Sequence, residues 1–501
     1  MVQDQIKDGR VRVLFMIQDS AYPQMGVLYL MDALEKAGIE SDVVTCKISR
    51  KNLHSILTKW NPNVVGMSVM TAPQVGEFAD HSIEIKRKFP DKTIVWGGVH
   101  STILSDECAK APYIDYVFVG QGEEVFPDLI RDVINQTNRY PKIVHGYSPS
   151  QLDKYNPAWN KVDLTQYLFS EQHSVRSPVT RTRKHTSLSF QELRSDIEGN
   201  NRELSSLAST RILEKIEKWD AGLYELDNRI FYYLLTSRGC PYKCTFCSEP
   251  LQIMNGNSEG NFFWNAHLLD WVKVQIDTIR ESLSKAGERL DGIGLWDDMF
   301  WVKYRSEPRA WDIINYLAEE NLTYLIEARA DQLLRDDCTL YQHLADTNCA
   351  QVFVGAESAS QETLDLIKKG TKVDGYYQLM ELSSKVKVPL RMSFIVGFPR
   401  ETDQSINATL DFCENVTRGA YGRWVNISGP KIFTPYPGTV EYQRAVAVGF
   451  RVPASHVEWG KIHRSTEAYL EYFPWMKKYS PSTLERLEVH FGKGYSTLFQ
   501  Y

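Results

Sequence analysis

Short apolar runs alternate with amphipathic stretches through the first part of the chain. The run "VRVLFMI" at 11–17 has the continuous hydrophobicity of a buried parallel strand, and "GVLYLMDALEKAG" at 26–38 has the spacing of a helix that ends at Gly38. The same alternation predicts further strands at 41–46, 63–71, 93–98 and 116–120. Helices between successive strands imply a doubly wound parallel sheet over residues 1–140, in which ligands bind at the carboxyl ends of the strands.

The alternation resumes on a larger scale at residue 229. Apolar runs there predict strands at 231–237, 291–296, 322–328, 350–355, 389–397 and 424–429. These strand–helix units predict a partial (β/α)6 barrel over 229–435, with its active site at the carboxyl ends of the strands. The expected fold class is therefore α/β.

Two segments depart from this pattern. Residues 141–228 contain a turn-rich stretch, "YSPSQLDKYNPAWN", then a basic stretch at 174–187, then a capping box of Ser189 and Glu192 that opens a helical stretch. We expect a linker and an inserted helical region there, with the basic stretch forming a solvated loop. Residues 436–501 are rich in aromatic residues, and we expect a mostly helical C-terminal region whose aromatic side chains pack in a core or line a substrate pocket.

Composition narrows the class of protein. The chain has 501 residues, is 43% hydrophobic and carries a net charge of −6, which argues against a nucleic-acid surface or a membrane-surface helix. No apolar run reaches about 18 residues, so no membrane span is expected, and the N-terminal stretch lacks the apolar core of a signal peptide. Five cysteines are scattered, as in proteins of a reducing cytoplasm, where we expect this protein to reside: Cys46, Cys108, Cys338, Cys349 and Cys413.

The other three cysteines are clustered in "TSRGCPYKCTFCSEP", at Cys240, Cys244 and Cys247. Structural zinc normally takes four ligands, and this stretch has no second cysteine pair, while the next histidine is His267. A [4Fe–4S] cluster prefers thiolate ligands. With three of them, one iron keeps an open position where another ligand can bind.

The cysteine spacing, its place after the first barrel strand and Phe246 before the last cysteine resemble the radical S-adenosylmethionine superfamily. The stretches "GIGLWDDMF", "EARADQL", "VFVGAESASQETLDLIKKG", "FIVGFPRET" and "FTPYPGT" resemble later strand ends of that family. The resemblance implies that Cys240, Cys244 and Cys247 bind a [4Fe–4S] cluster whose open iron holds S-adenosylmethionine. Reductive cleavage of that molecule then gives a 5′-deoxyadenosyl radical, chemistry that belongs to the cofactor.

The resemblance also implies residues around S-adenosylmethionine. Asp297 or Asp298 would accept from the methionine amino group, although the family's simpler Gly-Gly-Glu version is absent. Arg329 and Glu357 would hold the methionine carboxylate and the ribose hydroxyls, or else form salt bridges inside the barrel. The remaining expected contacts are Phe246, Ser393 and Gly397.

The N-terminal stretches "DSAYPQMGVLYLMDAL", "GGVHST" and "VGQGEE" resemble the cobalamin-binding domain of B12-dependent radical S-adenosylmethionine enzymes of the class B methyltransferase type. The resemblance implies a Rossmann-like domain in which strand-end glycines let the backbone approach a corrinoid, or else only form tight turns. The residues expected at cobalamin are Tyr22, Gly26, Met70, Thr71, Pro73, Gly97, Gly98, His100, Gly120, Gly122 and Glu123.

The Asp-x-His-x-x-Gly signature of enzymes that ligate cobalt through histidine is absent. We therefore expect no protein histidine below the cobalt. The loop at 69–74, with Met70, Thr71 and Pro73, is expected near the lower face, and His100 at the periphery of cobalamin.

Together these features predict a cobalamin-dependent radical S-adenosylmethionine methyltransferase. It would move a methyl group from methylcobalamin to an unactivated carbon of a small-molecule substrate after the 5′-deoxyadenosyl radical has removed a hydrogen. The expected partners are that substrate, a biosynthetic intermediate, and an external electron donor. A second hypothesis keeps the cofactors but has the protein perform an oxidative cyclisation or ring rearrangement without methyl transfer. The third and fourth hypotheses are a cofactor carrier without catalysis and a binding module with a closed zinc site.

Overall fold

The structure is a computed structural model. It describes residues 10–20, 23–71, 74–164, 231–248, 264–302, 307–335, 339–419, 421, 424–462 and 469–491. The helical stretch expected after Ser189, the basic stretch at 174–187, and the side chains of Tyr22 and Pro73 lie outside these residues.

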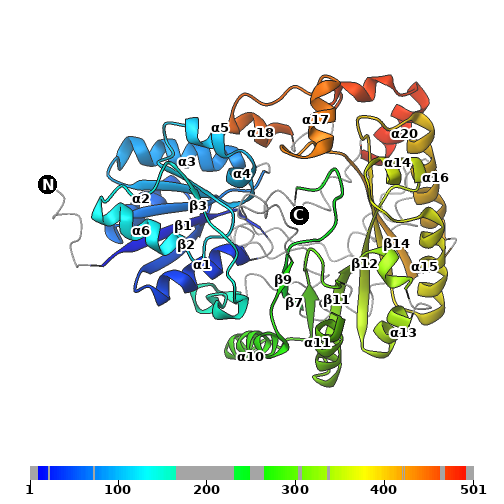
Figure 1. Cartoon of the computed structure of the whole chain (residues 1–501), viewed down its shortest axis with the longest axis horizontal. Helices are drawn as coiled ribbons and strands as arrows, with labels where there is room; N and C mark the ends of the chain where they lie inside the picture. The colour runs from blue at the N-terminus through cyan, green and yellow to red at the C-terminus, as the bar shows by residue number, and fades with distance from the viewer. Residues whose placement is uncertain are drawn as a thin grey trace, which may run out of the picture.

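The N-terminal domain is a six-stranded parallel sheet with the order β2-β1-β3-β4-β5-β6. Its strands are β1 (Arg12–Ile17), β2 (Glu40–Thr45), β3 (Val64–Ser68), β4 (Thr93–Gly97), β5 (Tyr116–Val119) and β6 (Ile143–His145). The helices between them are α1 (Met25–Lys36), α2 (Arg50–Lys59), α3 (Val75–Lys88), α4 (Gly98–Ile103), α5 (Ser105–Lys110) and α6 (Phe126–Asn135), drawn in blue and cyan in Figure 1. The sheet order reverses between β1 and β3, which is where ligands bind in doubly wound folds.

The sheet has one strand more than the sequence predicted. β6 pairs in parallel with β5 and carries the domain past residue 140. The strand has three residues and no helix follows it directly, so its apolar pattern is too short to stand out.

The second domain is a parallel sheet of six strands in the order β14-β13-β12-β11-β10-β7. Its strands are β7 (Phe231–Leu234), β10 (Gly292–Leu295), β11 (Thr323–Ala328), β12 (Cys349–Glu357), β13 (Leu390–Val396) and β14 (Val425–Ile432). Its helices are α10 (Leu269–Lys285), α11 (Glu307–Glu319), α12 (Ala330–Leu333), α13 (Thr339–Asp346), α14 (Gln361–Leu366), α15 (Val373–Val386) and α16 (Asp403–Thr417). Within the described residues β7 and β14 are the sheet edges, which confirms a partial barrel.

The barrel strands alternate in exposure. In β13 the side chains of Leu390, Met392, Phe394 and Val396 are buried, whereas those between them are half-buried. Period-two alternation puts these two sets on opposite faces. The buried set therefore packs against the outer helices, and the half-buried set lines the inner face of the barrel.

The C-terminal region is mostly helical, as predicted, with α17 (Val440–Ala447), α18 (His456–Ile462), α19 (Tyr469–Tyr472), η7 (Pro474–Lys478) and α20 (Pro481–Phe491). It bridges both domains (Figure 1). α18 lies against α3 of the first domain, so close that a Cβ on Gly76 would be 3.7 Å from Cα of Val457. α20 lies against α16 of the barrel, where Asn407 Nδ2 donates to Thr483 Oγ1 at 2.7 Å. Trp459 and Trp475 are both buried, in agreement with a packing role for the aromatic residues.

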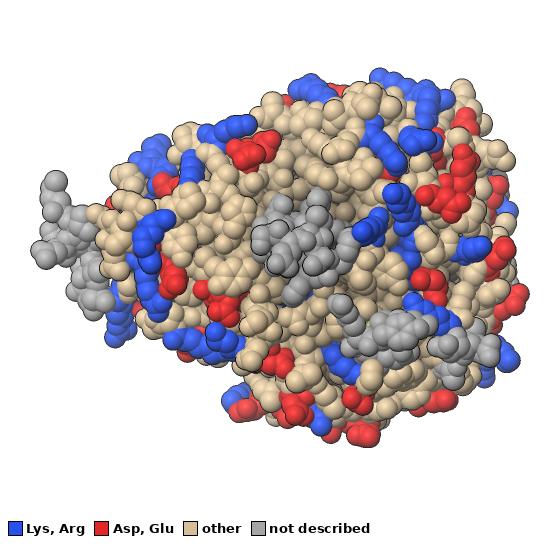
Figure 2. Space-filling view, viewed as in Figure 1, with Lys and Arg blue, Asp and Glu red and all other residues tan. Residues whose placement is uncertain are grey.

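The surface shown in Figure 2 carries lysine, arginine, aspartate and glutamate interspersed, without a broad field of one sign. Among the described residues, none of the helices has both the length and the apolar character that crossing a bilayer would require.

Candidate active site

The three clustered cysteines lie on one loop after the short strand β8 (Ser237–Arg238), which pairs with β9 (Asn265–Ala266). All three are reduced thiols and partly exposed. Thr245 anchors the loop, because its N–H donates to the carbonyl of Ile367 at 2.9 Å and its hydroxyl donates to Glu441 Oε1 at 2.6 Å. Glu441, in α17, is fully buried. Three accessible thiols on one anchored loop fit an iron–sulfur cluster with three protein ligands.

Arg329, at the end of β11, packs against this loop. Its guanidinium lies 3.7 Å from the ring centroid of Tyr242, and Nη1 lies 3.9 Å from Sγ of Cys244. Nε donates to Asp331 at 2.9 Å. The salt bridge expected as the alternative role of Arg329 is therefore present, and its contact with S-adenosylmethionine stays a prediction.

The two aspartates after β10 differ sharply. Asp297 is buried and accepts from the hydroxyls of Thr236 at 3.0 Å and Ser237 at 2.6 Å, and burial raises its pKa to about 6. Asp298 is exposed and accepts from the N–H of Gly239, one residue before the first cysteine of the cluster loop, at 3.2 Å. Only Asp298 has a carboxylate accessible beside that loop. Asp297 holds the strand ends together.

Glu357 ends β12 in the left-handed region, at φ 67°, which is uncommon for a residue other than glycine. Its carboxylate pairs with Lys369 Nζ at 2.8 Å. Gly355 makes room for it, since a Cβ there would lie 2.5 Å from Glu357 Oε1. Ser393 belongs to the half-buried, inward-facing set of β13. Both side chains therefore remain candidates for S-adenosylmethionine contacts.

Gly397 and Phe246 are held by packing. The N–H of Gly397 donates to Glu401 Oε2 at 2.7 Å and its carbonyl accepts from Trp475 Nε1 at 2.8 Å. Phe246 packs edge-on against Phe398 with ring centroids 5.8 Å apart. These contacts give both residues a structural role at the cluster side of the barrel, whatever else they touch.

Arg238 links the cluster loop to the N-terminal domain. Its Nη1 donates to Gln121 Oε1 at 2.8 Å and to Glu123 Oε1 at 2.6 Å, and its guanidinium lies 4.3 Å from the ring centroid of Tyr29. Glu123 Oε2 and Arg238 Nη2 are buried without a hydrogen-bond partner among the described residues. Orphaned polar atoms of this kind call for a partner, and amide-bearing groups such as those of a corrinoid could supply it.

Most of the glycines expected at cobalamin are required by the backbone conformation or by close packing. Gly98 has φ 85°, and a Cβ there would lie 2.9 Å from both N and O of Val69. A Cβ on Gly122 would lie 2.8 Å from Cδ2 of Leu30. Gly120 has φ 82°, and its N–H donates to Thr102 Oγ1 at 3.1 Å. Tight turns thus account for these positions, whereas a Cβ on Gly26 would meet no atom within 4 Å and leaves space for a ligand.

His100 is one of the residues expected at cobalamin. Its side chain is fully buried, and its two ring nitrogens lie 3.2 Å from Thr71 Oγ1 and 3.0 Å from His456 Nδ1. In this arrangement both ring nitrogens contact protein groups. The expected cobalamin contacts of His100 and of Thr71, whose hydroxyl faces His100, stay predictions.

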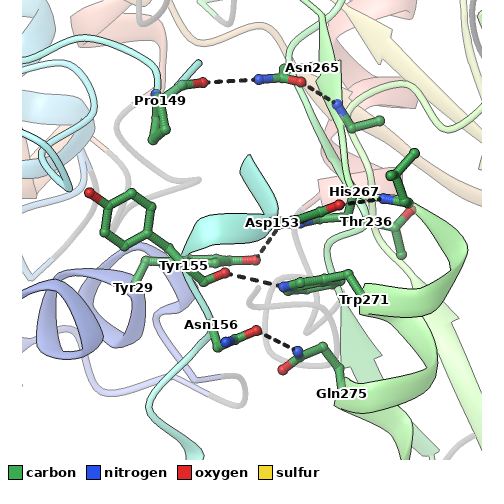
Figure 3. Close-up of polar contacts among 12 residues, drawn as sticks. Tyr29, Pro149, Asp153, Tyr155, Asn156, Thr236, Asn265, His267, Trp271 and Gln275 are labelled. Carbon is green, nitrogen blue, oxygen red and sulfur yellow. Dashed lines mark hydrogen bonds and ion pairs between the residues drawn. The ribbon is translucent and has the colours of Figure 1, made fainter. Parts of the chain in front are cut away.

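Residues 146–164, which we call the strap, form the first part of the predicted linker and bond to both domains. Asp153 Oδ1 pairs with His267 Nδ1 at 2.7 Å, Trp271 Nε1 donates to the carbonyl of Tyr155 at 3.2 Å, and Gln275 Nε2 donates to Asn156 Oδ1 at 2.9 Å (Figure 3). On its other side the strap contacts α1, where Asn156 N donates to Asp32 Oδ2 at 3.1 Å. Turn residues here build a bonded connection instead of a free one.

The inner face of the barrel holds ionisable residues that sequence reasoning missed. Glu327 accepts a hydrogen bond from Trp296 Nε1, and burial raises the pKa of its carboxyl to about 7. Burial also lowers the pKa of Lys431, in β14, to about 8. Arg391 lies opposite Phe353 in the sheet register, and Phe353 opposite Glu327. Arg391 could have been found from the sequence, because Arg391 and Ser393 are polar residues two positions apart in the otherwise apolar strand β13. Neither Glu327 nor Lys431 has a polar residue two positions away within its strand.

Comparison with known proteins agrees with this architecture. The B12 binding domain family matches residues 19–130, and the radical SAM superfamily matches residues 234–413. An uncharacterized methyltransferase of Pyrococcus horikoshii is 24% identical over 85% of this chain and 79% of its own length. The anaerobic magnesium-protoporphyrin IX monomethyl ester cyclase of Cereibacter sphaeroides is 21% identical over 84% of this chain and 60% of its own length.

Among solved structures, the radical S-adenosylmethionine methyltransferase TsrM from Kitasatospora setae, with cobalamin and a [4Fe–4S] cluster bound, has a TM-score of 0.55 and 18% identity. The similarity covers 89% of this chain and 80% of TsrM. At this identity the likeness concerns the fold.

The fold and the cysteine loop define a radical S-adenosylmethionine protein. Its N-terminal B12-binding domain places it among the cobalamin-dependent members of that superfamily. The two domain matches confirm the predicted fold class and the predicted set of cofactors, namely a [4Fe–4S] cluster, S-adenosylmethionine and cobalamin.

Proposed function

We propose that the protein is a cobalamin-dependent radical S-adenosylmethionine methyltransferase acting on an unactivated carbon of a small-molecule substrate in the cytoplasm. The observation that carries the proposal is the contact of Arg238, two residues before the first cluster cysteine, with Glu123 of the B12-binding domain at 2.6 Å. It brings the cluster loop and the B12-binding domain to one interface. A methyl donor and a radical generator need such proximity, because both must reach one substrate carbon.

Each group of residues has a part in this proposal. Cys240, Cys244 and Cys247 hold the cluster, Asp298 accepts from the amino group of S-adenosylmethionine, and Arg329 faces the same loop. Bound together, the cofactors supply a methyl group from one S-adenosylmethionine and a 5′-deoxyadenosyl radical from a second, with electrons from an external donor. The protein's own task is to position these groups and to exclude water.

Ionisable side chains on the inner face of the barrel favour a polar substrate. Glu327 has a pKa raised to about 7 and Lys431 a pKa lowered to about 8, both through burial, so each can change charge near neutral pH. Groups with such pKa values bind or exchange protons with polar ligands more readily than ordinary carboxyl and amino groups do. We therefore propose that the substrate carries ionisable groups.

The test needs no knowledge of the substrate. The anaerobically reconstituted protein, with cobalamin and a chemical reductant, is given S-adenosylmethionine that carries a deuterated methyl group. A methyltransferase transfers the label to the corrinoid and forms S-adenosylhomocysteine, and separately forms 5′-deoxyadenosine. We expect Cys244→Ala to abolish 5′-deoxyadenosine while retaining corrinoid binding, and the control Cys413→Ser, a buried cysteine in α16, to retain both.

One relative favours the second candidate, a cyclisation or ring rearrangement without methyl transfer, because the Cereibacter sphaeroides protein is named as a cyclase. That reaction needs 5′-deoxyadenosine but no methyl transfer to the corrinoid. If the deuterated methyl group stays off the corrinoid while 5′-deoxyadenosine forms, the methyltransferase proposal is wrong and the second candidate holds. Absence of both products would refute both.

A further inference from the structure

Three potential metal ligands meet where the C-terminal region contacts the B12-binding domain. His100 comes from α4, Cys108 from α5 and His456 from α18, and one ligand atom from each lies within 4.8 Å of the others. His100 and Cys108 are fully buried, and His456 is 8% exposed. Two imidazoles and a thiol are the donors that zinc prefers in proteins.

The two imidazoles already stand at the separation that a shared metal requires. His100 Nε2 and His456 Nδ1 are 3.0 Å apart. Two nitrogen ligands on a tetrahedral zinc, each at about 2.0–2.1 Å from the metal, would be roughly 3.3 Å apart. A small relaxation of the rings would therefore admit the ion.

Nδ1 of His100, the ring nitrogen that would not bind the metal, faces a hydrogen-bond partner, as the second ring nitrogen of metal-binding histidines usually does. This nitrogen lies 3.2 Å from the hydroxyl of Thr71, which can accept a hydrogen bond from Nδ1–H, and this tautomer leaves the lone pair on Nε2. Metal-binding histidines nearly always donate their second ring N–H to such a partner, which fixes the tautomer and the ring plane.

We propose that His100, Cys108 and His456 bind a zinc ion that fastens α18 to the B12-binding domain. Three protein ligands leave one tetrahedral position, and His456 also lines a surface cavity of about 400 Å³ together with Glu107, Tyr113 and Trp459. Water entering from that cavity completes the site. The ion is distinct from the iron–sulfur cluster and from cobalamin.

Zinc-edge X-ray absorption on the reconstituted holoenzyme tests the site, since neither the cluster iron nor the corrin cobalt contributes at that edge. The protein is supplied with zinc chloride and then passed over a weak chelating resin. We expect about one zinc per chain, with one sulfur at about 2.3 Å and two imidazole nitrogens at about 2.0–2.1 Å. A shell of three sulfurs would place the zinc on the cluster cysteines and overturn the proposal, as would a protein that keeps no zinc.

Variants separate the site from adventitious binding. His456→Ala and Cys108→Ser are each expected to lose the bound zinc, and Thr71→Val to weaken zinc affinity by about 10- to 100-fold. His343→Ala, a histidine on α13 whose Nε2 lies 2.9 Å from Asn315 Oδ1, and Cys413→Ser should keep it. Full zinc occupancy in His456→Ala would refute the assignment. If Cys108→Ser fails to fold, the absorption spectrum of the wild-type protein still decides.

Discussion

The ion pair between Glu123 and Arg238 allows a direct test of how the two domains are held together. The Glu123 side chain is 3% exposed and that of Arg238 17%, with 2.6 Å between Oε1 and Nη1. Removing one partner of a buried pair leaves the other charge without compensation and costs about 3–5 kcal/mol. Gln121 and the ring of Tyr29 still face Arg238, so we expect Glu123→Gln to cost about 3 kcal/mol, the lower end of this range.

The assay is differential scanning calorimetry under anaerobic conditions on equally reconstituted proteins. A loss of about 3 kcal/mol corresponds to a decrease in Tm of roughly 6–12 °C for domains of about 150–250 residues. The control is Glu124→Gln, the same substitution at the next residue. Among the described residues Glu124 forms an ion pair with Lys154 at 3.3 Å near the surface, so its loss should cost about 0–1 kcal/mol and change Tm by no more than about 2–4 °C.

The double variant Glu123→Gln/Arg238→Met decides whether the cost comes from an uncompensated charge. Removing both charges leaves none to be paired, so the double variant should regain most of the lost stability. A double variant at least as unstable as Glu123→Gln alone would refute the reasoning. It would mean that the side chains act through shape and not through charge.

Three further predictions concern other parts of the molecule. Burial lowers the pKa of His267 to about 4, below the ordinary value of about 6.5, so the unfolded state binds more protons between these two pH values. The contribution of His267 to stability is therefore fully present above about pH 6.5 and falls by about 3 kcal/mol as the pH drops towards 4. In acid unfolding curves, His267→Gln should flatten this pH dependence. Gly98→Ala should cost about 1–3 kcal/mol, seen as a lower denaturation midpoint, because its Cβ would lie 2.9 Å from the carbonyl of Val69 in a left-handed conformation; unchanged stability would contradict this. Glu441→Ala should lower the iron retained per chain after reconstitution, because Thr245 loses its 2.6 Å hydrogen bond and the cysteine loop loses its anchor. Glu441→Gln can still accept that bond and should retain more iron. Equal iron in both variants would argue against an anchoring role.

Elements that depend on nearby residues could be predicted from the sequence. Most strands coincide with an apolar run, as β1 and β3 do, because a parallel strand covered by helices on both faces is apolar along most of its length. The cysteine loop could be found for a similar reason, since its three thiols lie within eight consecutive residues. The short strand β6 gave too little pattern to be seen.

Contacts between distant segments could not be predicted. His100 and His456 are 356 residues apart, Thr245 and Glu441 196, and Glu123 and Arg238 115. A single sequence carries no sign of such pairs, because each member alone has the pattern of an ordinary helix or loop residue. For the same reason the sequence suggested Asp297 and Asp298 equally, and only the burial of Asp297 separates them.

The strap and α18 join the two domains along different routes. Strap residues bond to α1, to His267 and to α10, whereas α18 has one buried polar link to the first domain among the described residues, between His456 and His100. Segments with fewer hydrogen bonds open at lower free energy. We therefore expect α18 of the zinc-free protein to open before the strap does, with faster exchange of its amide hydrogens.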